Sequence, residues 1–323
     1  TNLRTPVALL LGLALACSSC GRALPTAPSD GAAAGLGRTA TPFRAQGSDD
    51  AAVVTLSPGA SGDEISSDFG ATLLAGSAPS FARLVPGAGE TCDQLVGRLA
   101  LDPRVVTVER DDVLETAETR QESYASDDGN GALQTYLEQP ATAAIHLDPA
   151  LSVSRGLGVT VAVLDTGVDP QHPALSGHLV AGYDFVDGDS SPIDTPDFLD
   201  NDGDGSVDEA FGHGTHVAGI VALTAPDARI MPIRVLDADG RGGVATVAAG
   251  IQYAIAHGAR VLSLSLGMLH RSDGIQNMLD AAEERGIVVI CSAGNWGAEH
   301  PTEYPASSSH ASAIGATDAS ARP

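Results

Sequence analysis

The ten residues VTVAVLDTGV, numbers 159–168, decide the fold class of this chain. Residues 159–164 are apolar except for Thr160 and lead into the carboxylate of Asp165, and such a run suits a parallel strand buried on both faces. Similar apolar runs follow further along the chain. They predict strands at 229–236, 261–266, 287–292 and near 313–316.

Segments with helical spacing separate these runs. Helices are expected at 214–223, 244–257 and 275–285, and Gly286 supplies the left-handed residue that stops the last one. Strands that alternate with helices predict an α/β fold with a doubly wound, mostly parallel sheet, because right-handed crossovers join such strands. Functional side chains are expected beyond the carboxyl ends of the strands.

The composition excludes some partners. Acidic residues outnumber basic ones 41 to 17, for a net charge of -24, so the chain repels nucleic acid and anionic lipid surfaces. A length of 323 residues allows one large domain and a smaller one. The four cysteines imply no disulfide framework, and Cys291, inside an apolar run, is expected to be a buried and inert thiol.

Residues 1–20 have the layout of a secretory signal. Arg4 precedes an apolar stretch from Val7 to Ala16, which is too short to cross a bilayer of about 30 Å as a helix. Two processing routes fit this segment. One is ordinary cleavage, and the other is lipid attachment at Cys17, with Cys20 as a rival acceptor. The expected location is outside the cell, in the periplasm or lipid-anchored at the envelope, with no transmembrane span.

The rest of the chain divides by composition. Residues 21–50 are rich in small residues and read as a flexible linker, whereas 51–115 carry short apolar runs and a helical segment typical of a small α+β domain. Residues 116–140 form a polar linker and processing region, and 141–323 form the large domain.

Four short motifs carry the chemistry. They are VLDTGV at 163–168, GHGTHVAG at 212–219, SLG at 265–267 and SAGN at 292–295. In this order and spacing they resemble the subtilisin-like (S8) serine protease family, and the likeness covers the chain from about Ala141 onward. The resemblance implies a subtilisin-like fold, of which this chain would hold an incomplete part, and a serine-type endopeptidase acting on polypeptides.

The resemblance assigns three catalytic roles. Asp165 would hold an imidazole in one tautomer and stabilise its charge, His213 would be the general base, and Asn295 would donate to the oxyanion. His216 is the other imidazole of the same motif, but it lies three residues along the helix and is expected to pack or cap instead. Extended substrate would bind to two backbone segments, namely Ser265, Leu266, Gly267 and Ser292, Ala293, Gly294.

The small domain would, by the same resemblance, be an inhibitory propeptide, which makes the chain a monomeric zymogen with its own propeptide as a partner. The nucleophilic serine belongs in a Gly-Thr-Ser element several dozen residues after Asn295, and the chain ends at Pro323. We therefore expect the serine to be missing and this fragment to be inactive. The serines that are present lack that context: Ser307, Ser308, Ser309, Ser312 and Ser320.

An acidic loop lies between the first two motifs. Carboxylates at alternate positions with a glycine at the sixth match the first half of a calcium-binding loop, with Phe211 in place of the closing glutamate. The candidate ligands for structural calcium are Asp200, Asp202, Asp204, Ser206, Asp208 and Glu209. A solvated acidic turn is the alternative. No organic cofactor is expected.

Two alternative functions share features of this sequence. The first is a catalytically inactive, calcium-binding subtilase-like protein that captures peptides. The second is a dinucleotide-binding domain, but no Gly-x-Gly-x-x-Gly follows the first strand of the large domain.

Overall fold

The computed structural model describes residues 50–74, 80–116, 136–137, 139–295 and 302–317. A six-stranded sheet forms the larger part, in the order β12-β11-β10-β6-β8-β7, and every pairing in it is parallel. Its strands are β6 (Thr160–Asp165), β7 (Tyr183–Asp184), β8 (Arg229–Arg234), β10 (Val261–Leu264), β11 (Val288–Ser292) and β12 (Ser312–Ile314). The predicted doubly wound α/β fold is confirmed.

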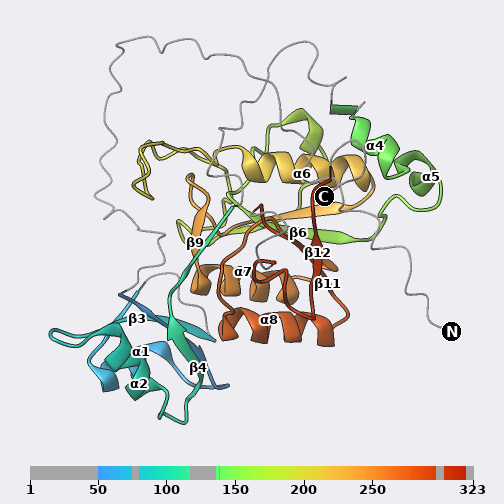
Figure 1. Ribbon diagram of the computed structural model, residues 1–323. Coiled ribbons are helices and arrows are strands. Elements are labelled where there is room, and N and C mark those ends of the chain that lie inside the picture. Colours follow the sequence, from blue (N-terminus) through green and yellow to red (C-terminus); the bar gives the residue numbers. More distant parts are fainter. Residues whose placement is uncertain (1–49, 75–79, 117–135, 138, 296–301, 318–323) are drawn as a thin grey trace.

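Helices cover both faces of this sheet (Figure 1). The helix α6 (His213–Thr224) lies on one face, and α7 (Val244–Ala256) and α8 (Asp273–Glu284) lie on the other. Strand β6 serves both layers, because Ala162 and Leu164 pack in the core with α7 and α8, whereas Val161 and Val163 pack in the core with α6. Successive side chains of a strand point to opposite faces, so a strand covered on both sides must be apolar throughout.

The expected elements of this unit are present, with shifts of one or two residues at their ends. Strand β10 stops at Leu264 because the chain leaves the sheet there, and α8 begins earlier than the spacing predicted because Ser272 caps it, accepting a hydrogen bond from the backbone N–H of Ile275 at 3.1 Å. Gly286 has a φ of 67° and ends this helical segment as expected.

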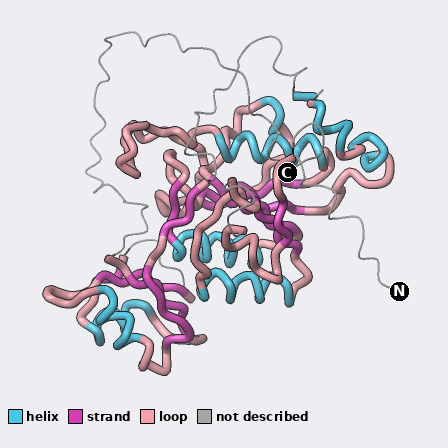
Figure 2. Tube along the Cα trace, viewed as in Figure 1, coloured by secondary structure: helices cyan, strands magenta, loops and turns pink. Residues whose placement is uncertain are grey.

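The smaller unit is an antiparallel sheet in the order β2-β3-β1-β4 with two helices against it (Figure 2). Its elements are β1 (Ala52–Leu56), α1 (Gly62–Phe69), β2 (Thr72–Leu73), β3 (Phe81–Val85), α2 (Cys92–Leu99) and β4 (Val105–Arg110). The sequence did not reveal β3, because Arg83 interrupts its apolar pattern. That guanidinium is buried and pairs with Asp111 at 2.6 Å.

Five short elements remain in the described ranges: β5 (Val113–Glu115), α4 (Pro140–Ala144), α5 (Leu147–Leu151), the 3-10 helix η1 (Pro173–Leu175) and β9 (Arg241–Gly243). Cys92 and Cys291 are buried free thiols. The predicted signal at 1–20 and most of the linker at 21–50 lie outside the described residues. Within the described ranges, no helix combines the length and apolar character needed to cross a bilayer.

Candidate active site

An aspartate and a histidine from different motifs meet at the carboxyl edge of the large sheet. Asp165 is the last residue of β6, and His213 is the first residue of α6. The Oδ1 atom of Asp165 lies 2.6 Å from Nδ1 of His213, and both residues are almost fully buried. An ionised carboxylate can only accept, so with Asp165 ionised a neutral His213 carries its proton on Nδ1 and has a lone pair on Nε2.

Glycine is needed where the two motifs touch. A Cβ on Gly214 would lie 2.0 Å from the carbonyl oxygen of Gly167 and 3.1 Å from Oδ1 of Asp165, so any side chain there would push the helix away from the strand. Gly212, which caps the helix, has a φ of 94° that other residues rarely adopt. The glycines of GHG therefore allow the close approach of His213 to Asp165.

A second acid, Asp194, links the two motifs. Its Oδ2 atom accepts hydrogen bonds from the hydroxyl of Thr166 and the backbone N–H of Gly212, both at 2.9 Å. Burial raises the pKa of Asp194 from 3.8 to about 6, and the two hydrogen bonds limit that rise. Sequence reasoning missed this residue, since a single aspartate in a polar loop carries no local signal.

An extended segment crosses the same edge of the sheet. Strand β5 pairs antiparallel with β9, and Glu115 exchanges two backbone hydrogen bonds with Gly267, at 3.0 and 2.9 Å. Strands β8 and β10 flank β6 in the sheet. Strand β9 follows β8 in the chain, and Gly267 follows β10. Segment β5 therefore lies at the edge of the sheet where β6 ends in Asp165, paired with the chain that follows β8 on one side and the chain that follows β10 on the other.

The two predicted wall segments follow neighbouring strands. Ser265, Leu266 and Gly267 come directly after β10, and Gly267 is the residue that pairs with β5. Ser292 ends β11, and Ala293 and Gly294 continue from it. Asn295 follows Gly294 and is exposed. It comes after β11, which is separated from β6 by β10 in the sheet. His216 is exposed on the first turn of α6, and its neighbour Thr215 accepts a hydrogen bond from the backbone of Asp169.

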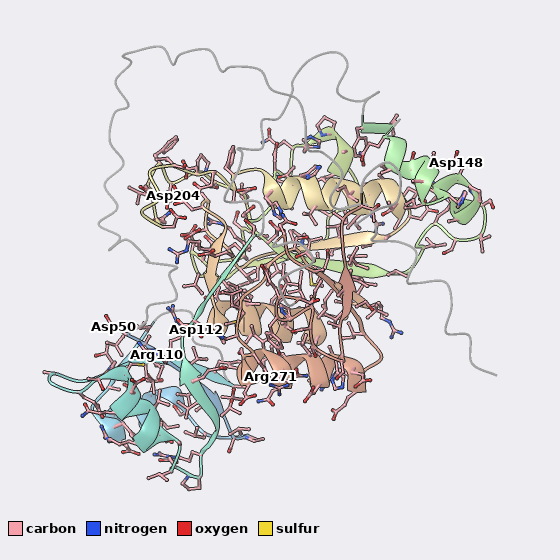
Figure 3. All side chains as sticks on the ribbon, viewed as in Figure 1. Asp50, Arg110, Asp112, Asp148, Asp204 and Arg271 are labelled. Carbon is pink, nitrogen blue, oxygen red and sulfur yellow. The ribbon has the colours of Figure 1, made fainter. Side chains whose placement is uncertain are left out.

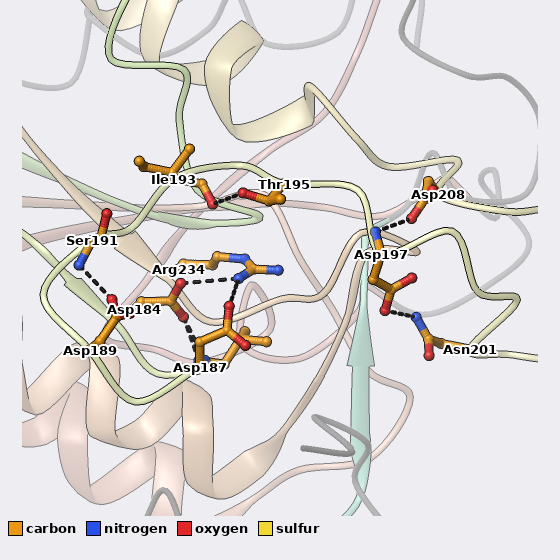
Figure 4. A network of polar contacts seen from close by, with 11 residues as sticks. Asp184, Asp187, Asp189, Ser191, Ile193, Thr195, Asp197, Asn201, Asp208 and Arg234 are labelled. Carbon is orange, nitrogen blue, oxygen red and sulfur yellow. Dashed lines mark hydrogen bonds and ion pairs between the residues drawn. The ribbon is translucent and has the colours of Figure 1, made fainter. Parts of the chain in front are cut away.

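The predicted calcium ligands do not all converge. Carboxylate oxygens of Asp200, Asp202 and Asp204 lie within 4.8 Å of one another on an exposed loop, where Figure 3 labels Asp204. Asp208 does not belong to this group. Its carboxylate accepts hydrogen bonds from the backbone N–H of Asp197 (Figure 4) and from that of Phe198. Ser206 contributes a backbone N–H to the carboxylate of Asp204.

A buried carboxylate faces this acidic loop. Glu209 is 6% exposed, and its carboxyl group lies within hydrogen-bond reach of another carboxyl group, that of Asp239. Burial raises the pKa of Glu209 to about 7, with repulsion from Asp239, Asp202 and Asp204 adding to it. Asp239, which lies outside the predicted set of ligands, is fully buried and accepts hydrogen bonds from the backbone of Asn201 and Asp208. A buried carboxylate beside three other acids, Asp239, Asp202 and Asp204, fits a divalent cation.

A guanidinium holds the loop that precedes this acidic segment. Arg234, at the end of β8, lies 3.0 Å from the carboxylate of Asp184 and 2.7 Å from that of Asp187 (Figure 4). Asp189, in the same loop, accepts a hydrogen bond from the backbone of Ser191. These contacts of Arg234 join the end of β8 to residues 184–191, the segment that precedes Asp194 and the acidic loop.

The smaller unit contacts the larger one through two acids at the end of β4. Glu109 accepts hydrogen bonds from the backbone of Gly274 and the hydroxyl of Ser272, both at 2.8 Å, at the amino end of α8. Asp111 accepts one from the backbone of Ala245, in the first turn of α7, at 3.3 Å. Carboxylates at helix amino termini satisfy free N–H groups and meet the positive end of the helix dipole.

Comparisons with known proteins agree with this geometry. A model of the subtilase family, peptidase S8, matches residues 156–322. Thermitase from Thermoactinomyces vulgaris is 41% identical over 184 residues, which are 54% of this chain and 60% of thermitase. Subtilisin BL from Lederbergia lenta is 38% identical over 172 residues, or 50% of this chain and 57% of that protein. The chain thus spans less than two thirds of the length of these relatives.

A solved structure has a similar fold. The crystal structure of fervidolysin from Fervidobacterium pennivorans, described as a keratinolytic enzyme related to subtilisin, matches with a TM-score of 0.54 and 24% sequence identity. The match covers 80% of this chain and 42% of the fervidolysin chain.

Proposed function

Because this chain belongs to the subtilase family, we propose that it is part of a serine endopeptidase precursor that hydrolyses peptide bonds through an Asp/His/Ser triad. The observation that carries the proposal is the 2.6 Å contact between Asp165 and His213, buried at the carboxyl edge of a parallel sheet. An extended segment, β5, lies at the same edge in the manner of a substrate.

The proposed mechanism follows from the tautomer of His213. A serine hydroxyl beside Nε2 attacks the scissile carbonyl carbon and gives its proton to Nε2, while Asp165 stabilises the imidazolium. The N–H of the Asn295 side chain donates to the oxygen that becomes negative. The imidazolium then protonates the leaving amine, and water hydrolyses the acyl-enzyme with His213 as base.

The test is covalent labelling of the full-length product of the source gene. A fluorophosphonate should label one serine of the processed protein, and peptide mapping of the adduct identifies that residue. His213→Ala should abolish labelling, whereas His216→Ala, a matched change in the same helix, should retain it. Absence of labelling in a folded, processed wild type would refute the endopeptidase proposal and favour an inactive peptide-binding subtilase.

We further propose that residues 51–115 are an inhibitory propeptide with β5 as its inhibitory strand. Support comes from the pairing of β5 with β9 and Gly267, which blocks the edge where substrate would bind, and from the docking of Glu109 on α8. Removal of the small unit then requires cleavage in the 115–131 region. Amino-terminal sequencing that found an uncut chain in active natural protein would overturn this assignment.

We propose calcium as a structural ion at the acidic loop. Asp200, Asp202 and Asp204 together with Glu209 would hold it, with Asp239 supporting the site. Bound calcium would neutralise a cluster of like charges and fasten the loop that leads into α6. It would take no part in peptide hydrolysis.

The protein is proposed to be exported and to act on polypeptides as a monomer. Export is supported by similarity to relatives such as the minor extracellular protease Vpr of Bacillus subtilis. Fractionation of cells that express the full-length gene, with a labelled lipid precursor, would separate ordinary secretion from anchoring at Cys17 or Cys20.

A further inference from the structure

The carboxylate of Glu115, at the end of β5, meets a guanidinium of the large unit. In the antiparallel pairing of β5 with β9, Glu115 lies directly opposite Arg241. The Oε1 atom of Glu115 is 3.2 Å from Nε of Arg241, and the two side chains are 34% and 20% exposed. Directly opposed residues of an antiparallel pair place their side chains on one face of the sheet, so the two charges meet there.

Contacts within the large unit hold Arg241 in place. Its backbone N–H donates to the carboxylate of Asp237 at 2.9 Å, and its carbonyl oxygen accepts from the backbone N–H of Asp237, also at 2.9 Å. At the other end of the side chain, Nη1 donates to the carbonyl oxygen of Asn201 at 3.4 Å. These three contacts do not involve the small unit, so the guanidinium keeps its position when β5 is removed.

The other neighbour of Glu115 is a glycine. Glu115 and Gly267 exchange two backbone hydrogen bonds, at 3.0 and 2.9 Å, which any residue at the place of Glu115 can make. Gly267 has no side chain with which to choose among residues at that place. The choice therefore depends on Arg241, the residue on the opposite side of β5.

Three acids work against the attraction of Arg241 for a carboxylate. Glu303 lies against Gly267, and burial raises the pKa of Asp202 and of Asp237, with the positive charge of Arg241 limiting each rise. Their negative charges weaken the net attraction, and solvent reaches both partners of the ion pair. A preference of a few fold is therefore expected, smaller than a fully buried pair would give.

We propose that Arg241 gives the peptidase a preference for glutamate at the substrate position that pairs with Arg241 and Gly267. The proposal rests on the proposed endopeptidase function, with β5 in the path of the substrate, and adds a substrate class to it. In the processed protein the substrate side chain takes the place that Glu115 leaves, so no other space is required. A lysine at this position meets a like charge.

The first test measures kcat/KM for peptides of one sequence that carry glutamate, glutamine or lysine at a single position, taken in turn along the residues before the scissile bond. Glutamine has the shape of glutamate without its charge, so packing alone does not distinguish the two. The processed full-length protein, titrated with a fluorophosphonate, should cleave the glutamate peptide about fivefold faster than the glutamine peptide at one position, and the lysine peptide about fivefold more slowly. High salt should reduce both differences.

Variants assign the preference to one residue. Arg241→Gln should cleave the glutamate and glutamine peptides equally, and Arg241→Glu should favour the lysine peptide. Arg260→Gln, a matched change at an exposed arginine just before β10, should retain the preference of the wild type.

The outcomes separate the two proposals. Labelled wild type that cleaves glutamate and glutamine peptides equally at every position would refute the role of Arg241 and leave the endopeptidase proposal intact. A preference that persists in Arg241→Gln would do the same. Protein that is never labelled would refute both proposals.

A measurement on the precursor, kept uncut by His213→Ala, does not depend on turnover. The backbone N–H of Gly267 donates to Glu115 at 2.9 Å, so its hydrogen exchange reports the opening of β5. Arg241→Gln and Glu115→Gln should each speed this exchange about fivefold, and the double variant should exchange no faster than either single variant. Additive effects would show that the two charges are not coupled and would overturn the proposal.

Discussion

Replacing Asp194 with asparagine should make the protein more stable at neutral pH. In the folded state the pKa of Asp194 is raised from 3.8 to about 6, so the folded form holds this proton more tightly than the unfolded form does. The associated stability is complete below pH 4 and is lost as the pH rises through about 6. Two pH units at 1.36 kcal/mol each make the loss about 3 kcal/mol.

The substitution removes the charge and keeps an oxygen that can accept from Thr166 and Gly212. The free energy of unfolding of Asp194→Asn, relative to wild type, should therefore rise by about 2 kcal/mol between pH 4 and pH 7, since the carboxyl of the unfolded chain is already partly ionised at pH 4. Urea unfolding at a series of pH values, on protein inhibited with a fluorophosphonate, measures this difference. Asp148→Asn, on the exposed surface of α5, is the control and should show no such change.

Parallel stability curves for wild type and Asp194→Asn would refute the reasoning, because they would mean that Asp194 stays ionised at no cost. A variant that becomes less stable at pH 7 would show that the negative charge itself holds Thr166 and Gly212 in place.

Three further changes test other parts of the structure. Calcium at 100 times its Kd should raise the Tm of the wild type by about 5–10 °C. It should raise the Tm of Glu209→Gln by much less. An equal rise in both proteins would exclude Glu209 as a ligand. Glu109→Ala should speed amide hydrogen exchange in the first turn of α8 by about 10–100-fold. Glu64→Ala, a change at an exposed acid, should not. Unchanged exchange in Glu109→Ala would contradict the contact of Glu109 with the amino end of α8. Asn295→Ala should lower kcat by about 10²–10³-fold, the effect of removing one oxyanion donor in subtilisin, while Asn277→Ala should not. A normal kcat for Asn295→Ala would remove that residue from the mechanism.

Patterns within single segments of the sequence predicted most strands and helices of the large sheet. A strand covered on both faces needs apolar residues at every position, so the runs that became β6, β8, β10 and β11 were visible without any knowledge of their neighbours. The glycines around His213 were also local signals, since a helix start that must approach a strand closely allows no side chain there. The pairing of Asp165 with His213 came from the family resemblance, which supplied the long-range contact.

Contacts between distant segments could only come from the tertiary structure. The sequence determined the parallel α/β architecture, the strand and helix order, and the motif aspartate and histidine, because each of these depends on residue patterns within one segment. The tertiary structure decided the bridging role of Asp194, the convergence of Glu209 with Asp239, the pairing of β5 with β9 and the ion pair between Arg241 and Glu115. Each of these joins segments far apart in the chain, and a single acid or a three-residue strand has no local pattern that specifies its partner.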